Sequence, residues 1–296
     1  MEGSRRYLEP EVLASISGLE YKARLMVEGY LSGAHRSPWH GFSVEFAQHR
    51  EYVFGDDLRH LDWKIWGRTD RLYIKQYDAE TNFECVLVLD ASGSMGFGSG
   101  PMTKLEYAKH CAAALAYLVI RQRDAVGLHV LGSSGTVLQP STSPSRLKEV
   151  LHYLEQAAPA GKTALAEELF SVAERRGRRK VVVVLSDFVE EEDALFRALG
   201  LLGSGRHDVL LVHLLDPAEV AFPFRDFSAF EGLEGEGVLR VEPSMLRQVY
   251  LEELNRHSLL LKNTAAEMNM DYLPLVTDRS LAEVLSAYLV SRSARR

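Results

Sequence analysis

The chain has 296 residues, a formal net charge of −7, 46% hydrophobic residues and 25% charged residues. These values are typical of a globular protein with one large or two unequal domains, and the negative charge argues against a general nucleic-acid binder. The two cysteines, Cys85 and Cys111, lie in apolar runs without the spacing of a metal site, which indicates buried thiols in a reducing compartment.

The chain shows no targeting or membrane-spanning segment. Residues 1–12 lack the apolar core of a signal peptide. The longest uncharged apolar run, 111–120, is too short to span a bilayer. We therefore expect a cytoplasmic protein that is not an integral membrane protein.

The pattern of the sequence changes near residue 80. Residues 1–80 interleave aromatic and charged side chains without a helix–strand rhythm, and we expect a smaller N-terminal region there. In residues 81–296, short aliphatic runs alternate with longer amphipathic ones, which predicts an α/β fold with a mostly parallel sheet and helices on both faces. Strands are expected at 84–89, 125–131, 181–185, 208–215 and 272–276, helices at 104–123, 145–156, 164–176, 194–202, 244–267 and 280–290, and a long surface loop at 222–236.

The sequence VLVLDASGSMG, residues 86–96, places one carboxylate and two hydroxyls where the first aliphatic strand ends. In a near-extended segment, Asp90, Ser92 and Ser94 project to one side, and ligands of open α/β sheets bind beyond the carboxyl ends of the strands. Oxygen ligands without sulfur or imidazole suit Mg²⁺, Mn²⁺ or Ca²⁺ rather than Zn²⁺. The motif therefore predicts a divalent-cation site, although Asp, Ser and Gly also dominate ordinary turns.

Two other segments bring further oxygen donors to the same predicted edge. Thr163 follows Gly161 and Lys162 directly before a helix, and Asp187 follows the aliphatic strand 181–185. Asp187 also has a second interpretation, because an acid before a helix stabilises the helix N-terminus.

The same segments do not match two common catalytic motifs. The phosphate-binding pattern GxxxxGK[ST] requires glycine at the position of Gln156, so nucleotide hydrolysis by this chain alone is not expected. The pattern GxSxG around Ser94 would require glycine at Ser92, and the sequence positions no histidine to activate a nucleophile.

The DASGS motif, the distant threonine before a helix and the later strand-terminal aspartate resemble the metal-ion-dependent adhesion site of von Willebrand factor A domains. The resemblance implies that Ser92, Ser94 and Thr163 bind the ion directly and that Asp90 and Asp187 act directly or through water. It also implies that an acidic side chain of a partner fills the open coordination position.

The N-terminal region carries a second set of matching positions. They are Gly33-Ala34-His35-Arg36-Ser37, Gly41, Glu45-Phe46, Arg50, Tyr52, Gly55-Asp56-Asp57, Arg59 and Asp62-Trp63. These positions resemble the signature of the bacterial domain-of-unknown-function 58 family (DUF58), whose members couple it to a von Willebrand A-like domain. Many relatives carry transmembrane helices ahead of the signature, and none is expected here. The resemblance also implies pairing with a MoxR-type AAA+ ATPase.

The main hypothesis is a non-enzymatic, metal-dependent protein-interaction module that acts as an adaptor or effector of such an ATPase, with Mg²⁺ favoured over Mn²⁺ or Ca²⁺. The alternative is a Mg²⁺-dependent hydrolase or phosphoryl-transfer enzyme that uses the same ion as a Lewis acid. It would need a base or a nucleophile near the ion, for which the sequence offers Lys104 and the acids of residues 190–193. A scaffold with an empty site is a third interpretation.

Overall fold

The computed structural model describes most of the chain from residue 84 onward and parts of the chain before it. The chain divides into two compact units, Trp39–Phe83 and the remaining residues. Much of 1–80 lies outside the described residues, so the predicted division into 1–80 and 81–296 stays a prediction. The described residues are Leu19, Ala23, 42–51, Gly67, 71–80, 84–132, 135–162, 165–174, 179–205, 207–235 and 237–294.

The smaller unit contains an antiparallel strand pair that the sequence did not predict. β1 (Phe42–Glu51) pairs with β2 (Tyr73–Glu80), and the register shifts at two places along β1. Glu45, Phe46 and Arg50, which contribute to the resemblance to DUF58, lie on β1. The interleaved aromatic and charged residues of this region therefore include one antiparallel strand pair.

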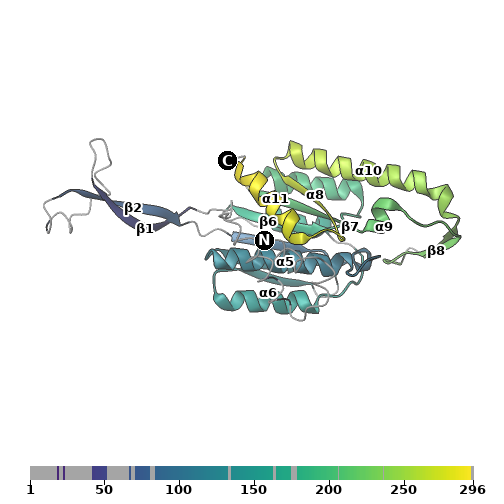
Figure 1. The fold of residues 1–296 in the computed structure, drawn as a ribbon, viewed down its shortest axis with the longest axis horizontal. Coiled ribbons are helices and arrows are strands. Elements are labelled where there is room, and N and C mark those ends of the chain that lie inside the picture. Colours follow the sequence, from purple (N-terminus) through teal and green to yellow (C-terminus); the bar gives the residue numbers. More distant parts are fainter. Residues whose placement is uncertain are drawn as a thin grey trace. The chain divides into compact units, whose positions relative to one another are not determined.

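The larger unit is built around a mixed sheet (Figure 1). Within the described part of the chain, six strands are ordered β10-β7-β6-β3-β4-β5, and all neighbours are parallel except β4 and β5. The predicted mostly parallel sheet is thus confirmed. The strands are β3 (Glu84–Leu89), β4 (Ala125–Val130), β5 (Thr136–Ser141), β6 (Lys180–Ser186), β7 (Asp208–Leu215) and β10 (Asp271–Val276).

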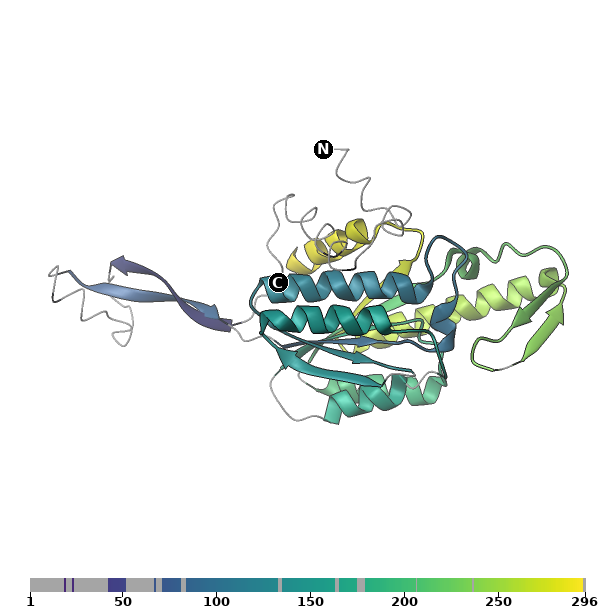
Figure 2. The same cartoon turned by 90° about the horizontal axis from the view of Figure 1, so that it is seen from below.

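The central strands are aliphatic throughout because both of their faces are covered. Alternate side chains of a strand point to opposite faces, and Val86, Val88, Val182 and Val184 share one apolar core with α7 and α8. Figure 2 shows α5 and α6 together on the opposite face. The described helices are α5 (Lys104–Arg121), α6 (Pro144–Gln156), α7 (Leu165–Glu174), α8 (Glu192–Ser204), α9 (Pro217–Ala221), α10 (Pro243–Glu267) and α11 (Leu281–Ala294).

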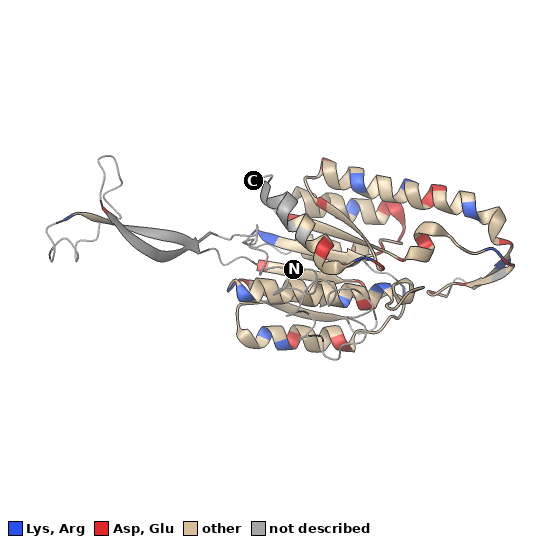
Figure 3. Ribbon diagram, viewed as in Figure 1, with Lys and Arg blue, Asp and Glu red and all other residues tan. Residues whose placement is uncertain are grey.

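Helices α6 and α10 carry charged residues of both signs. Figure 3 shows acidic and basic residues interspersed along α6 and α10. Mixed charge of this kind is usual for the solvated face of an amphipathic helix. Among the described residues, no helix combines the length and the apolar character needed to cross a bilayer.

The expected long loop at 222–236 is wrong in part, because the segment contributes to a β-hairpin. β8 (Ser228–Glu231) pairs antiparallel with β9 (Val238–Val241). The backbone of the tip closes through a hydrogen bond from Gly232 N to Gly237 O at 2.7 Å. Gly237 has φ +97°, a conformation that glycine adopts without a steric penalty. The glycines that suggested a loop form the tip of a hairpin instead.

Candidate metal centre

The candidate site lies at the carboxyl end of β3, where the order of the parallel strands reverses. β4 lies on one side of β3 and β6 lies on the other, and such a switch point is where open α/β sheets bind ligands. Leu89 of β3 is in register with Leu185 of β6, so the residues that follow both strands emerge together. The backbone N–H of Asp90 donates to Leu185 O at 2.9 Å. Asp90 and Asp187 therefore share one edge, as the sequence predicted.

Asp90 is fixed by neighbours on both of its carboxylate oxygens. It is 0% exposed, its Oδ1 accepts from Ser92 N at 2.9 Å, and its Oδ2 accepts from Ser186 Oγ at 2.6 Å. Burial and then the nearby charge of Asp187 raise the pKa of Asp90, against hydrogen bonds from Ser186 and Ser92 that lower it. A cation at this edge would relieve that unfavourable burial of negative charge.

The two serine hydroxyls lie side by side at the start of the short 3-10 helix η3 (Gly93–Gly96). Ser92 Oγ and Ser94 Oγ are 3.1 Å apart and share a hydrogen bond. Two adjacent ligands of an octahedral ion bound at 2.0–2.1 Å are separated by about 2.9 Å, and the longer bonds of Ca²⁺ widen this to about 3.3 Å. The hydroxyl pair therefore has a spacing compatible with a divalent cation such as Mg²⁺, Mn²⁺ or Ca²⁺.

Asp187 is held by a buried ammonium group that the sequence did not assign to the site. Lys104 Nζ lies 2.8 Å from Asp187 Oδ2 and 2.7 Å from Glu219 Oε1, and its side chain is 2% exposed. Burial lowers the pKa of Lys104, but the charges of Asp187 and Glu219 outweigh it and the pKa is raised overall. Lys104 is therefore a fixed cation. Both oxygens of Asp187 have a hydrogen-bond partner, since Oδ2 accepts from Lys104 Nζ at 2.8 Å and Oδ1 accepts from Val189 N at 3.3 Å.

The backbone after β6 is strained at the site. Phe188 has φ +55°, which is uncommon for a residue with a bulky side chain. Its N–H donates to Ser186 Oγ at 2.8 Å, and that hydroxyl in turn donates to Asp90 Oδ2. Ser186 thus connects the turn after β6 to the carboxylate that follows β3.

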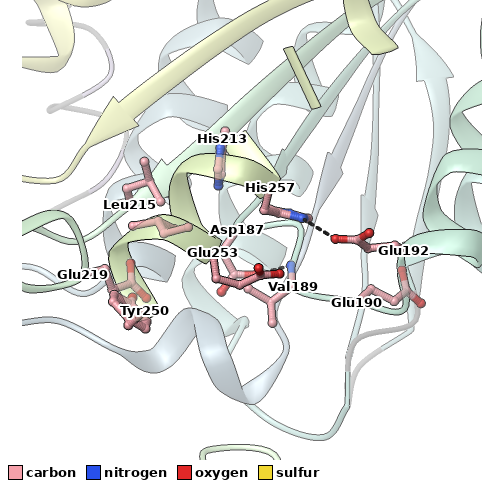
Figure 4. Close-up of a pocket in the computed structure, with 11 residues that line it drawn as sticks. Asp187, Val189, Glu190, Glu192, His213, Leu215, Glu219, Tyr250, Glu253 and His257 are labelled. Carbon is pink, nitrogen blue, oxygen red and sulfur yellow. Dashed lines mark hydrogen bonds and ion pairs between the residues drawn. The ribbon is translucent and has the colours of Figure 1, made fainter. Parts of the chain in front are cut away.

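A cavity of about 260 Å³ opens beside Asp187 (Figure 4). Glu190, which lines it, has a raised pKa, first because of burial and also because of the charge of Asp90, although the N–H of Ala166 donates to Glu190 and opposes the shift. Other acidic side chains of the lining are Glu192, Glu219 and Glu253. Glu219 is paired with Lys104, and Glu192 and Glu253 are both paired with Arg256, so basic side chains compensate these three charges.

The tip of the β8–β9 hairpin reaches the same loop from far along the chain. Glu234 Oε1 accepts from Ser94 N at 3.3 Å, across 140 positions of sequence. The carbonyl oxygen of Leu233 faces Gly93 so closely that a Cβ there would lie 2.2 Å from it. The serine loop is thus covered by a segment that the sequence predicted as a surface loop.

Hydrogen bonds link three of the five predicted ligands, Asp90, Ser92 and Ser94. Asp187 follows the neighbouring strand at the same sheet edge, and Thr163 lies outside the described residues. Within the described ranges, no three His, Cys, Asp or Glu side chains are grouped to hold a metal, so the site depends on its hydroxyls. The donors are hard oxygens, and this set fits Mg²⁺, Mn²⁺ or Ca²⁺.

Sequence reasoning missed the roles of Lys104, Glu219 and Glu234. Lys104 appeared only as a candidate base for the enzymatic alternative. Its position as the first residue of a helix, directly after the capping residue Thr103, gave no sign of the buried ion pairs. Glu219 and Glu234 lie on α9 and on the hairpin tip, elements that the sequence did not predict.

The fold and the site define a von Willebrand A-like α/β protein whose oxygen donors gather at the carboxyl edge of the sheet. The profile of the family described as "Protein of unknown function DUF58" matches residues 48–259. The chain therefore belongs to this family, in agreement with the resemblance of its N-terminal signature.

Relatives of similar length occur in mycobacteria. "Uncharacterized protein Mb1516" of Mycobacterium bovis and "Uncharacterized protein Rv1480" of Mycobacterium tuberculosis are each 28% identical over 291 residues, which is 96% of this chain and 90% of theirs. Among solved structures, the "conserved hypothetical protein BatB" from Bacteroides thetaiotaomicron has TM-score 0.47 and 18% identity, covering 72% of this chain and 100% of BatB. The VWA domain of SpRpn10 has TM-score 0.41 and 14% identity, covering 69% of this chain and 93% of that domain.

Proposed function

We propose that the chain is a non-enzymatic protein-interaction module that binds an acidic side chain of its partner through a divalent cation. The observation that carries the proposal is the pair of hydroxyls of Ser92 and Ser94, 3.1 Å apart beside the fixed carboxylate of Asp90. When bound, the ion would offer an incompletely filled coordination shell. Asp90 would hold the serine loop in place, and Lys104 would keep Asp187 from repelling the incoming acid.

The partner class that the family resemblance implies is a MoxR-type AAA+ ATPase, with this chain as its adaptor or effector in the cytoplasm. A protein that hydrolyses ATP would supply the energy, and this chain would supply recognition, since its segment before Thr163 does not match a phosphate-binding loop. Mg²⁺ is the favoured ion, with Mn²⁺ or Ca²⁺ as alternatives, since hard oxygen ligands suit all three.

Metal binding is tested by isothermal titration calorimetry with Mg²⁺, Mn²⁺ and Ca²⁺. The wild type should bind Mg²⁺ and Mn²⁺, and Ser92→Ala with Ser94→Ala should abolish binding. Ser204→Ala is the matched control, because this exposed serine lies at the end of α8 and bonds only to Leu201 O among the contacts described for it. Equal binding by the wild type and the double variant would refute the proposed site.

Partner capture is tested with a purified MoxR-type ATPase from the source organism. The wild type should retain the ATPase on an affinity resin in Mg²⁺ and release it in a chelator, and Asp90→Ala should retain less. Capture that is unchanged by both treatments would remove the proposed mechanism.

The hydrolase alternative requires a base or a nucleophile near the ion. Of its candidates, Lys104 is a protonated cation between two carboxylates and is unsuited to either role. Turnover of a panel of phosphoesters that depends on Mg²⁺ and on Ser92 would favour the alternative over the binding module.

A further inference from the structure

The hairpin tip places a third acid on a loop that already adjoins two buried acids. Glu234 accepts a hydrogen bond from Ser94 N, on the same loop as Asp90. Glu234 is partly buried here, whereas Glu231 on the same hairpin is exposed. The carboxylate of Glu234 therefore lies against the loop that carries the two serine hydroxyls.

The hairpin is held by an aromatic cluster, and its tip is exposed. Phe230 of β8 packs with Phe222 and Phe224, at ring-centroid distances of 6.0 and 5.3 Å. At the tip, Leu233 is 51% exposed and Val238 is 57% exposed. Segments with few buried apolar contacts open at low free-energy cost. The tip can therefore leave the serine loop while Phe230 stays packed.

We propose that Glu234 is an internal acidic ligand of the candidate metal centre and occupies the position that a partner's carboxylate must take. The hairpin tip covers the site in the free protein, and a partner acid displaces it. This inference rests on the proposed function. It adds that Glu234 competes with the partner's carboxylate for the same coordination position. Partner capture then depends on the release of the hairpin tip from the serine loop.

Two substitutions separate the tip from the site by different means. Glu234→Gln removes the charge of the ligand and keeps its length. Gly93→Ala changes no proposed ligand, but its Cβ would lie 2.2 Å from Leu233 O, so the tip and the serine loop must separate. The matched controls are Glu231→Gln, which makes the same charge change on the same hairpin, and Gly100→Ala, whose Cβ would meet nothing within 4 Å.

The experiment combines hydrogen–deuterium exchange of residues 228–241 with calorimetry, using Mg²⁺ as the probe. Mg²⁺ should slow exchange at the tip in the wild type and in both controls, and it should have no such effect in Glu234→Gln or Gly93→Ala. The Mg²⁺ affinity of Glu234→Gln should fall on the order of tenfold, the lower end of the effect of losing a group that supports a metal site.

Acetate then stands in for the carboxylate of a partner. In the presence of Mg²⁺, acetate should restore fast exchange at the tip of the wild type, and chloride at the same ionic strength should not. If Mg²⁺ binds through Ser92 and Ser94 but neither protects the tip nor binds more weakly to Glu234→Gln, the internal ligand is refuted and the proposed function stands. If the wild type binds no Mg²⁺, both are refuted.

Discussion

Replacing Lys104 by Met removes the one ammonium group described between Asp187 and Glu219 and keeps most of the volume of the side chain. The distances of 2.8 and 2.7 Å indicate two direct ion pairs, and the side chain is 2% exposed. Removing one partner of a buried ion pair costs about 3–5 kcal/mol, because the other charge stays buried without compensation. For a domain of this size, the melting temperature should fall by roughly 10 °C.

Thermal unfolding by circular dichroism measures this loss, with and without Mg²⁺. Lys148→Met is the control, because Lys148 is exposed on α6. Mg²⁺ should raise the melting temperature of Lys104→Met more than that of the wild type, since the ion replaces the missing positive charge. At ten times its Kd, the ion contributes about 1.4 kcal/mol. A melting temperature of Lys104→Met equal to that of Lys148→Met would refute the buried ion pairs.

Three further predictions concern the core. Burial, followed by the charge of His257, lowers the pKa of His213 to about 3. As the pH falls from 6.5 toward 3, only the unfolded state takes up this proton, so the folded state loses stability. Urea unfolding should show that His213→Gln loses about 1.4 kcal/mol less stability per pH unit than the wild type over this range. Burial raises the pKa of Cys85 and Cys111 to about 12. We therefore expect that neither thiol reacts with Ellman's reagent until the protein unfolds. Fast labelling of the folded protein would contradict this expectation. Gly127→Ala places a Cβ 2.7 Å from Leu138 O across the β4–β5 pair, and chemical denaturation should show a loss of about 1–3 kcal/mol, whereas unchanged stability would mean that β5 shifts freely.

Much of the larger unit was predictable because its elements carry local patterns. The expected strand 84–89 is β3 to the residue, and the expected helix 145–156 differs from α6 by one residue. A strand covered on both faces is aliphatic throughout, and this pattern needs no knowledge of its neighbours. β5 was missed because it is a half-exposed edge strand, and TVLQPS has no continuous apolar run.

The residues of the candidate site also fall into those that the sequence could predict and those that it could not. Asp90, Ser92 and Ser94 were predictable because they belong to one short motif at the end of a buried strand. Asp187 was predictable because its strand also ends there, and parallel strands bring their carboxyl ends to one edge. The ion pair between Lys104 and Asp187 was not predictable, because it joins groups 83 positions apart that meet only across the packed sheet and helix α5.

The sequence by itself determined the α/β class, the mostly parallel sheet and the edge at which the oxygen donors emerge, because hydrophobic periodicity and strand-end polarity are local properties of the chain. Only the tertiary structure decided which charges surround those donors. Lys104 neutralises Asp187, and Glu234 covers the serine loop, because packing brings distant elements together. The balance of charge at the site is thus a property of the folded chain.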